Sequence, residues 1–176
     1  MMKSSKKIAL SGMISALAVV IMLIAYFPYL TYALPAIAGV LFSVIMIEIN
    51  SKWALGSFAS AAILSLVLCE KESSFLFVAF FGYYPILKAY LERIPSRVLE
   101  YIVKFIVFNV ATIVSYLVII YVFRIPIEDM GAFGRYTILI LLGMGNVMFV
   151  VYDMAVSKLI DEYMFKLHRR VGRMLK

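Results

Sequence analysis

The sequence has little of what most enzymes and secreted scaffolds depend on. One cysteine, Cys69, and one histidine, His168, occur in 176 residues, which excludes an intramolecular disulfide and an ordinary zinc cluster of histidine and cysteine ligands. Charged residues make up 15% of the chain, against about 25% in ordinary soluble domains, and 65% of the residues are hydrophobic. With a mean hydropathy of +1.01, the chain is predicted to be an integral membrane protein.

Catalytic patterns are missing as well. A membrane enzyme needs paired carboxylates, metal ligands or an activated nucleophile on one helix face, and none stands out. Glu70, Lys71 and Glu72 are interpreted as a solvated outer turn, because no histidine lies near them to complete a metal site. No glycine-rich loop ends in Gly-Lys-Ser/Thr, so the chain cannot drive transport with its own ATP hydrolysis. We expect no catalytic residues, no metal and no cofactor.

Six long apolar runs dominate what is present, and charged residues separate them. They cover about residues 8–26, 32–47, 53–69, 75–91, 99–123 and 135–157. A helical crossing needs about 20 apolar residues, so these runs predict an all-α bundle of six transmembrane helices. The first run follows three lysines like a signal peptide, but no small-residue cleavage site follows it, and we expect a retained helix. Residues 1–160 are thus predicted to form a single membrane domain.

Basic residues divide unevenly between the two sides of this bundle. With the N-terminus inside, 14 of the 17 basic residues fall on the inner side and three on the outer side, Lys71, Arg124 and Arg135. Inner loops retain lysine and arginine, so both termini are predicted to be cytoplasmic, in a multi-pass protein of a cell membrane, most simply a bacterial plasma membrane. This topology and anionic lipid explain the net charge of +7 without nucleic acid as a partner. Residues 161–176 alternate apolar and basic side chains and are predicted to form an amphipathic tail on the inner leaflet, with a solvated tail as the alternative.

Two amides lie deepest in the predicted bundle, Asn109 in the fifth run and Asn146 in the sixth. Thr112 and Tyr116 follow Asn109 at offsets of three and seven, so the three residues share one helix face, which we expect to point into the bundle or a water-filled cavity. An amide in hydrocarbon must find a partner. That partner is either a bound ligand or the other helix, and the sequence leaves both open.

The fourth run carries an aromatic stripe, which serves either packing or ligand binding. It consists of Phe77, Phe81 and Tyr84, with Tyr83 beside it, Lys88 one turn further and Pro85 expected to bend the helix. Lys88 is expected to extend its ammonium group to the inner interface.

Other charged residues have simple expected partners. Glu48 and Asp153, near the inner side, are expected to pair with cations of the loops. Arg124 and Arg135 either hold an anionic ligand group or pair with Glu128 and Asp129 of the same loop.

Small residues form two strips on the first helix, and small residues permit close approach of another helix. One strip is Ala9, Gly12 and Ala16, and the other is Ser11, Ser15 and Ala18. The third run repeats the pattern with two strips, Gly56 with Ser60 and Ser57 with Ala61. Internal packing accounts for one such strip, so the second is predicted to contact another protein.

Four stretches in order complete a larger pattern. They are KKIALSGMISAL at 6–17, LPAIAG at 34–39 paired with SKWALG at 51–56, YPIL at 84–87, and Gly145-Asn146. With six helices and both ends inside, this order resembles the substrate-binding S-components of energy-coupling factor (ECF) vitamin transporters over nearly the whole chain. The pair at 34–39 and 51–56 looks like that family's helix 2 and its Gly-Pro-Lys-Trp-Gly type turn into helix 3.

The resemblance implies a non-enzymatic subunit that captures a vitamin or related micronutrient with high affinity in an outward-facing pocket. A transmembrane coupling protein and two cytoplasmic ATPases would complete the ABC importer. The family's pocket maps onto Tyr83, Tyr84, Asn109, Tyr116, Arg135 and Asn146. Its Ala-x-x-x-Ala docking motif maps onto Gly12 and Ala16, where glycine replaces the first alanine, within the strip of Ala9, Gly12 and Ala16.

Two other classes of function remain open. A stand-alone carrier of small solutes, if coupled to protons or ions, needs an ionisable residue at the midplane, where this sequence has only amides. A structural or assembly subunit of a membrane complex needs no pocket and would use the small-residue strips equally well.

Overall fold

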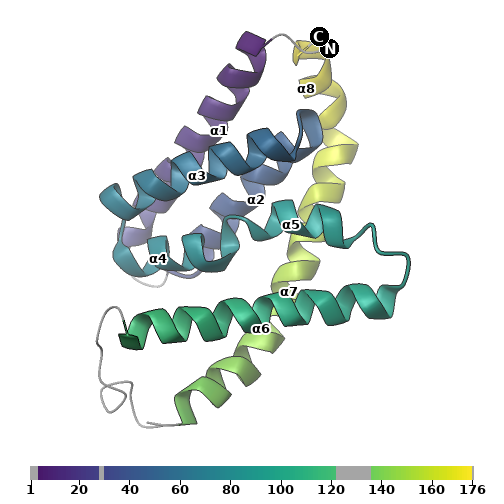
Figure 1. Cartoon of the computed structure of the whole chain (residues 1–176). Helices are drawn as coiled ribbons and strands as arrows, with labels where there is room; N and C mark the ends of the chain where they lie inside the picture. The colour runs from purple at the N-terminus through teal and green to yellow at the C-terminus, as the bar shows by residue number, and fades with distance from the viewer. Residues whose placement is uncertain (1–3, 28–29, 122–135, 176) are drawn as a thin grey trace. The chain divides into compact units, whose positions relative to one another are not determined.

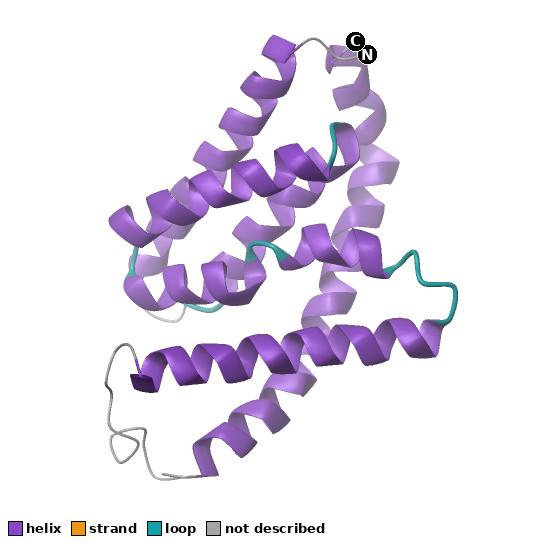
Figure 2. Cartoon of the chain, in the orientation of Figure 1, coloured by secondary structure: helices purple, strands orange, loops and turns teal. Residues whose placement is uncertain are grey.

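The computed structural model describes residues 4–27, 30–121 and 136–175, and within these ranges the chain is helical and contains no strand (Figure 2). Figure 1 shows the elements in chain order, coloured from purple to yellow. They are α1 (Ser4–Leu23), the 3-10 turn η1 (Ile24–Tyr26), α2 (Ala33–Glu48), α3 (Ser51–Leu68), α4 (Lys71–Leu76), the π-helical segment η2 (Phe77–Phe81), α5 (Tyr84–Leu91), α6 (Arg97–Tyr121), α7 (Thr137–Lys166) and α8 (His168–Leu175).

Five helical segments of the described residues are long and apolar enough to cross a membrane. They are Ser4–Tyr26, Ser51–Leu68, Lys71–Leu91, Arg97–Val118 and Leu142–Lys166. The remaining apolar run, at 32–47, is helical too, but its helix α2 has only 16 residues, a length of about 24 Å at 1.5 Å per residue. The prediction of an all-helical protein with membrane-length apolar helices is therefore confirmed.

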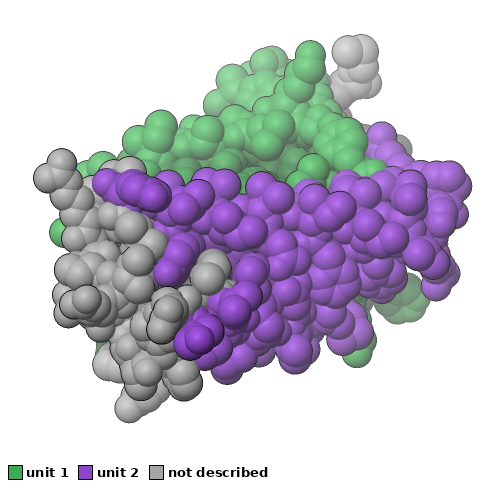
Figure 3. Space-filling view, turned by 60° about the horizontal axis from the view of Figure 1, so that its bottom comes forward, with its two compact units in different colours: residues 1–90, 155–176 green, residues 91–154 purple. Residues whose placement is uncertain are grey.

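The chain divides into two compact units, coloured separately in Figure 3. Unit 1 contains residues 1–90 and 155–176, and unit 2 contains residues 91–154. The division passes through α7. Each unit is described by itself below.

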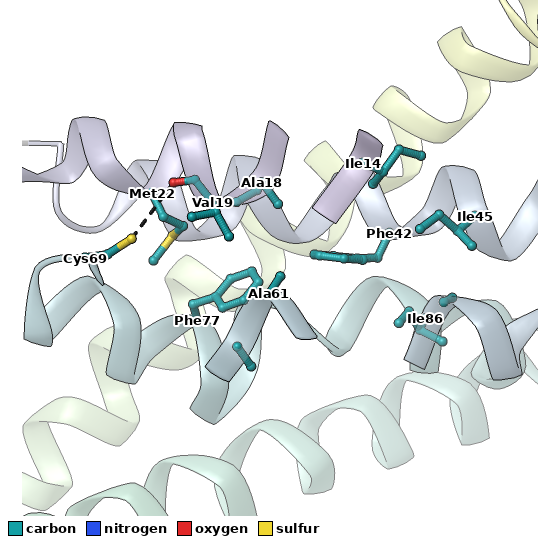
Figure 4. Close-up of a cluster of buried hydrophobic side chains, with 13 residues drawn as sticks. Ile14, Ala18, Val19, Met22, Phe42, Ile45, Ala61, Cys69, Phe77 and Ile86 are labelled. Atoms are coloured by element: carbon teal, nitrogen blue, oxygen red, sulfur yellow. Dashed lines mark hydrogen bonds between the residues drawn. The ribbon is translucent and has the colours of Figure 1, made fainter. Parts of the chain in front are cut away.

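Unit 1 is built on α1, α2 and α3, which pack against one another, while α2 also packs against η2. Alanines at the crossings, such as Ala18, Ala38 and Ala61, are almost completely buried and let the helices approach closely. Phe42 and Phe77 fill the space beside them, with ring centroids 6.0 Å apart. Figure 4 shows these side chains converging from helices that are distant in sequence.

One glycine marks the closest approach in unit 1. A Cβ on Gly39 of α2 would lie 2.0 Å from the carbonyl oxygen of Phe81. That oxygen is the α-helical partner of residue 85, but Pro85 has no N–H to donate. The helix accordingly changes to π geometry over η2, where Gly82 N–H donates to the Phe77 carbonyl at 2.8 Å, and α-helix resumes at Tyr84. The bend predicted at Pro85 is an interruption of the helix at Gly82 and Tyr83, just before the proline.

Residues 70–72 correct a prediction. They do not form a solvated turn, because Lys71 and Glu72 begin helix α4 and Glu70 is its N-cap. The Glu70 carboxylate accepts hydrogen bonds from the backbone N–H groups of Glu72, at 2.8 Å, and Ser73, at 2.7 Å. Burial opposes the charged form, but these bonds prevail and lower the pKa of Glu70 below its ordinary value.

The C-terminal part of the chain joins unit 1 at the end of α2. Helix α7 continues to Lys166 and α8 follows, so the predicted tail is helical. Glu48 accepts a hydrogen bond from the Tyr163 hydroxyl at 2.7 Å, and its Oε1 lies 2.8 Å from His168 Nδ1. The expected loop cation for Glu48 is therefore wrong: its partners are helical residues of the C-terminal segment.

Candidate functional site

The two deep amides, Asn109 of α6 and Asn146 of α7, bind each other in unit 2. Asn109 Nδ2 donates to Asn146 Oδ1 at 3.0 Å, and Asn146 Nδ2 donates to Asn109 Oδ1 at 2.9 Å. Each amide also donates to its own helix, Asn109 to Phe105 and Asn146 to Leu142. All four N–H donors of the pair are thus used within the protein. The remaining capacity for a ligand is acceptor capacity at the two Oδ1 atoms.

Aromatic rings also join the two helices of unit 2 that carry the amides. Phe149 of α7 stacks on Phe108, with centroids 4.8 Å apart and an interplanar angle of 12°, and meets the Phe105 ring edge-on at 5.5 Å. Gly145 brings α7 close to the same ring, since a Cβ there would lie 3.0 Å from Phe108. The sequence analysis did not single out these three phenylalanines. Their spacing from the asparagines, one helical turn or less, was the available signal.

A buried cluster of charges lies on the same two helices. Lys104 Nζ lies 3.2 Å from Asp153 Oδ2 and 2.6 Å from Glu100 Oε1, and its side chain is 2% exposed. Glu92 is a more distant partner at 3.8 Å, and the Tyr101 ring lies 5.4 Å from the ammonium group. The expected loop cation for Asp153 is therefore wrong, because its partner lies on α6. The spacing of Glu100 and Lys104, four residues apart on a helix, was the overlooked signal.

Tyr83 and Tyr84 lie in unit 1, inside a group of aromatic rings. Tyr84 is completely buried and stacks on Phe80, with centroids 4.7 Å apart and an interplanar angle of 30°. Tyr83 is half-buried and meets Phe58 edge-on at 6.1 Å. Tyr84 is thus held by packing, and Tyr83 keeps a face that a ligand can reach.

Other predicted residues have different environments. Tyr116 is half-buried on α6, on the face of Asn109 and Thr112, and the Thr112 hydroxyl donates to the Phe108 carbonyl at 3.0 Å. Arg135 and Arg124, with Glu128 and Asp129, lie outside the described residues. Lys88 corrects a prediction: its side chain is completely buried and does not extend to an exposed interface.

The two small-residue strips on α1 have opposite environments. Ser11, Ser15 and Ala18, the buried strip, face the other helices of unit 1, and the Ser15 hydroxyl donates to the Ser57 carbonyl at 3.2 Å. Ala9, Gly12 and Ala16, which we call the docking strip, are exposed. A Cβ added to Gly12 would meet nothing within 4 Å. The docking strip is therefore an open surface on the helix.

The described residues thus present two polar centres in unit 2 and an open small-residue surface in unit 1. No three histidine, cysteine or carboxylate side chains gather as metal ligands would anywhere in residues 4–27, 30–121 or 136–175. No protein-family model, no curated protein and no solved structure matches this chain.

Proposed function

We propose that the chain crosses the membrane six times, with α2 as the sixth span and both termini in the cytoplasm. The uneven division of basic residues supports this topology. The contacts of Glu48 with Tyr163 and His168 support it as well, because they join the C-terminal segment to the end of α2, beside the inner residue Lys52. Reporter fusions after Lys71 and after Lys176 should give opposite signals. An external signal at Lys176 would contradict the topology.

We propose that the protein is the substrate-binding S-component of an ECF-type importer and captures a vitamin-like micronutrient for uptake. The observation that carries the proposal is the docking strip of Ala9, Gly12 and Ala16, which stays exposed on α1 while the neighbouring strip is buried. In a bilayer such a strip permits a partner helix to pack at backbone distance. The partner is the transmembrane coupling protein, which brings the two ATPases; this chain catalyses no reaction itself.

Within unit 2, the proposed polar contacts to the substrate are the amides Asn109 and Asn146, with Tyr116 on the same face of α6. The half-buried ring of Tyr83 supports a role in stacking on a ligand. The free acceptor positions of the amide pair favour a ligand that donates hydrogen bonds, since the amide donors are already used. Small molecules released from the detergent-purified protein, identified by mass spectrometry, would name the substrate class.

Docking can be tested separately from substrate binding. Gly12→Leu places a bulky side chain in the docking strip, where an added Cβ meets no atom within 4 Å. Copurification of the coupling protein and ATPases from the native membrane should be lost, while ligand carry-through persists. Gly143→Leu on α7 is the matched control, because Gly143 is also exposed with open space around it.

The outcomes separate the three classes of function. Full copurification of Gly12→Leu with its partners would contradict docking through α1. Copurification of partners with a wild-type protein that never carries a ligand would indicate a structural subunit. Ligand binding without any copurifying ATPase would indicate a stand-alone carrier.

A further inference from the structure

A groove with a volume of about 560 Å³ runs between α1 and α3 in unit 1. Its lining consists of Ile8, Ser11, Gly12, Ser15, Lys52, Trp53, Gly56, Ser57 and Ser60. These residues come from the N-terminal halves of two helices that both begin on the side predicted to be inner. The groove is thus an open slot that reaches from the inner end of the helices toward their middle.

The two helices are joined at their other ends. The Cys69 thiol lies 3.9 Å from the Val19 carbonyl, a contact drawn in Figure 4, and the Tyr26 hydroxyl donates to the Leu68 carbonyl at 3.3 Å. In the groove itself, Gly12 and Gly56 have no side chains to fill the space, and an added Cβ at either residue would meet nothing within 4 Å. Such an open slot in a membrane protein is filled by lipid or by another helix, because water is scarce in hydrocarbon.

One polar group in the lining has no partner. Ser11 is 7% exposed, and its Oγ is a buried side-chain atom without a hydrogen-bond partner in the structure. Ser60 and Ser65 donate to carbonyls of their own helix, at 3.0 and 2.9 Å, but Ser11 does not. A buried hydroxyl that stays unpaired is unfavourable. An acceptor placed in the groove would give the Ser11 hydroxyl the partner that it lacks.

The inner end of the groove is positively charged and amphipathic. Lys52 is exposed in the first turn of α3, where the helix dipole adds positive potential, and it makes no ion pair with any other described residue. Trp53 lies beside it, and tryptophan is the side chain that prefers the interface between headgroups and hydrocarbon. None of the nine lining residues is acidic. The groove thus favours an anion at its end and an apolar body along its length.

We infer that the α1–α3 groove binds one anionic phospholipid. The headgroup phosphate lies at Lys52, an ester carbonyl of the glycerol region accepts the hydrogen bond from Ser11, and an acyl chain lies over Gly56 on the α3 side of the groove. This order matches a lipid of the inner leaflet, whose charge, esters and chain follow one another into the bilayer. The inference does not depend on transport or on the coupling protein.

The test uses the full-length protein in mild detergent with an equimolar mixture of phosphatidylglycerol and phosphatidylcholine, and native mass spectrometry counts the lipid retained. Wild type should retain phosphatidylglycerol about fivefold over phosphatidylcholine, the preference expected of one lysine at an anionic headgroup. Lys52→Gln should remove the preference. Lys71→Gln, a matched exposed lysine in the first turn of α4, should leave it unchanged.

Two further variants test the groove itself. Ser11→Ala should lower retention of both lipids and leave the preference intact, since it removes a contact to the ester that both lipids share. Gly56→Leu fills the groove and should abolish lipid retention, whereas the control Gly143→Leu should not. Gly12 is not substituted in this test, because it belongs to the docking strip. Equal retention of the two lipids by wild type, an undiminished preference in Lys52→Gln, or displacement of the lipid by millimolar inorganic phosphate would overturn the inference.

Discussion

The contacts inside unit 1 differ in kind from the contacts inside unit 2. In unit 1 the buried side chains are mainly alanine, serine, phenylalanine and aliphatic residues, and α1, α2 and α3 meet through small residues. In unit 2 the only described residues that are buried are Lys104, Phe149 and Asp153. Its two helices are joined by an ion pair, a reciprocal pair of amides and three phenylalanine rings.

This difference reflects the solvent. Lipid chains are as apolar as leucine, so burying leucine between helices gains little in a membrane, and helices associate through close packing or through polar bonds. Unit 1 uses close packing at glycine, alanine and serine. Unit 2 uses polar bonds, which confine charged and amide side chains to one face of α6 and α7. We expect the stability of the two units to respond to different substitutions.

The largest expected effect is the loss of the buried cation of unit 2. Lys104→Met leaves the Asp153 and Glu100 carboxylates without their ammonium partner. Breaking a buried ion pair on one side costs about 3–5 kcal/mol. The free energy of unfolding in detergent should fall by this amount. Hydrogen exchange should become faster in α6, while α1–α3 stay protected. The double variant Lys104→Met with Asp153→Leu should recover much of the loss.

A matched control separates burial from charge in that experiment. Lys166 also pairs with a glutamate four residues away, Glu162, but both side chains are about 60% exposed. Lys166→Met should leave unfolding unchanged, because exposed ion pairs contribute little. If Lys104→Met behaved like Lys166→Met, the ion pair would not hold unit 2 together.

The next largest effect is expected at the close contact of unit 1. Gly39→Ala brings a Cβ to 2.0 Å from the Phe81 carbonyl oxygen, a backbone atom that cannot move alone. Overpacking of this kind costs about 1–3 kcal/mol. Gly12→Ala is the control, since its added methyl group meets nothing. Thermal unfolding should separate the two variants, and equal midpoints would show that α2 and η2 can move apart freely.

The sequence predicted the helices well because their signal is local. Apolar runs located the helices to within a few residues, except that α7 continues nine residues beyond the sixth run, from about 157 to Lys166. Pro85 indicated the interruption of the fourth run, since a missing N–H is a property of one residue. Contacts between residues that are distant in the sequence were harder to predict. Asp153 was assigned a loop cation because sequence order does not show that Lys104, 49 residues earlier, faces it from a neighbouring helix.

For the same reason, only part of the candidate site could be predicted from the sequence. The face shared by Asn109 and Tyr116 follows from helical periodicity, but the choice between ligand and helix as partner of the amide needed coordinates. The two α1 strips are similarly equivalent in sequence, and only packing distinguishes the buried Ser15 from the exposed Ala16. The orphan hydroxyl of Ser11 could not be predicted at all, because serines usually bond to their own helix.

A smaller effect is expected from the amide pair. Asn109→Ala removes the reciprocal bonds to Asn146, and interhelical bonds of this kind contribute about 0.6–1.7 kcal/mol in membranes. A double-mutant cycle with Asn146→Ala should give a coupling energy of this size from unfolding measurements. If the amides bind substrate instead, each single variant should weaken ligand affinity about ten- to a hundredfold. If the two substitutions had additive effects on the free energy of unfolding and left the ligand affinity unchanged, the amides would neither stabilise each other nor bind substrate.

The smallest effect tests the edge of unit 1, where a charge and not packing supports the chain. Glu70→Gln removes the carboxylate that caps α4, and an anion at a helix N-terminus is worth about 0.3–1 kcal/mol. The pKa of Glu70 is lowered in the folded protein, so its stabilisation is present above the unfolded value of 4.5 and is lost as the pH falls through the lower folded value. Wild type should therefore have a higher thermal unfolding midpoint than Glu70→Gln at pH 7, and the two midpoints should be equal at strongly acidic pH. Glu72→Gln is the control: it removes the same charge from the same turn, but the Glu72 carboxylate does not cap the helix, so this variant should have the weaker effect. If wild type and Glu70→Gln still differed in stability below the folded pKa of Glu70, the cap would act through geometry and not through charge.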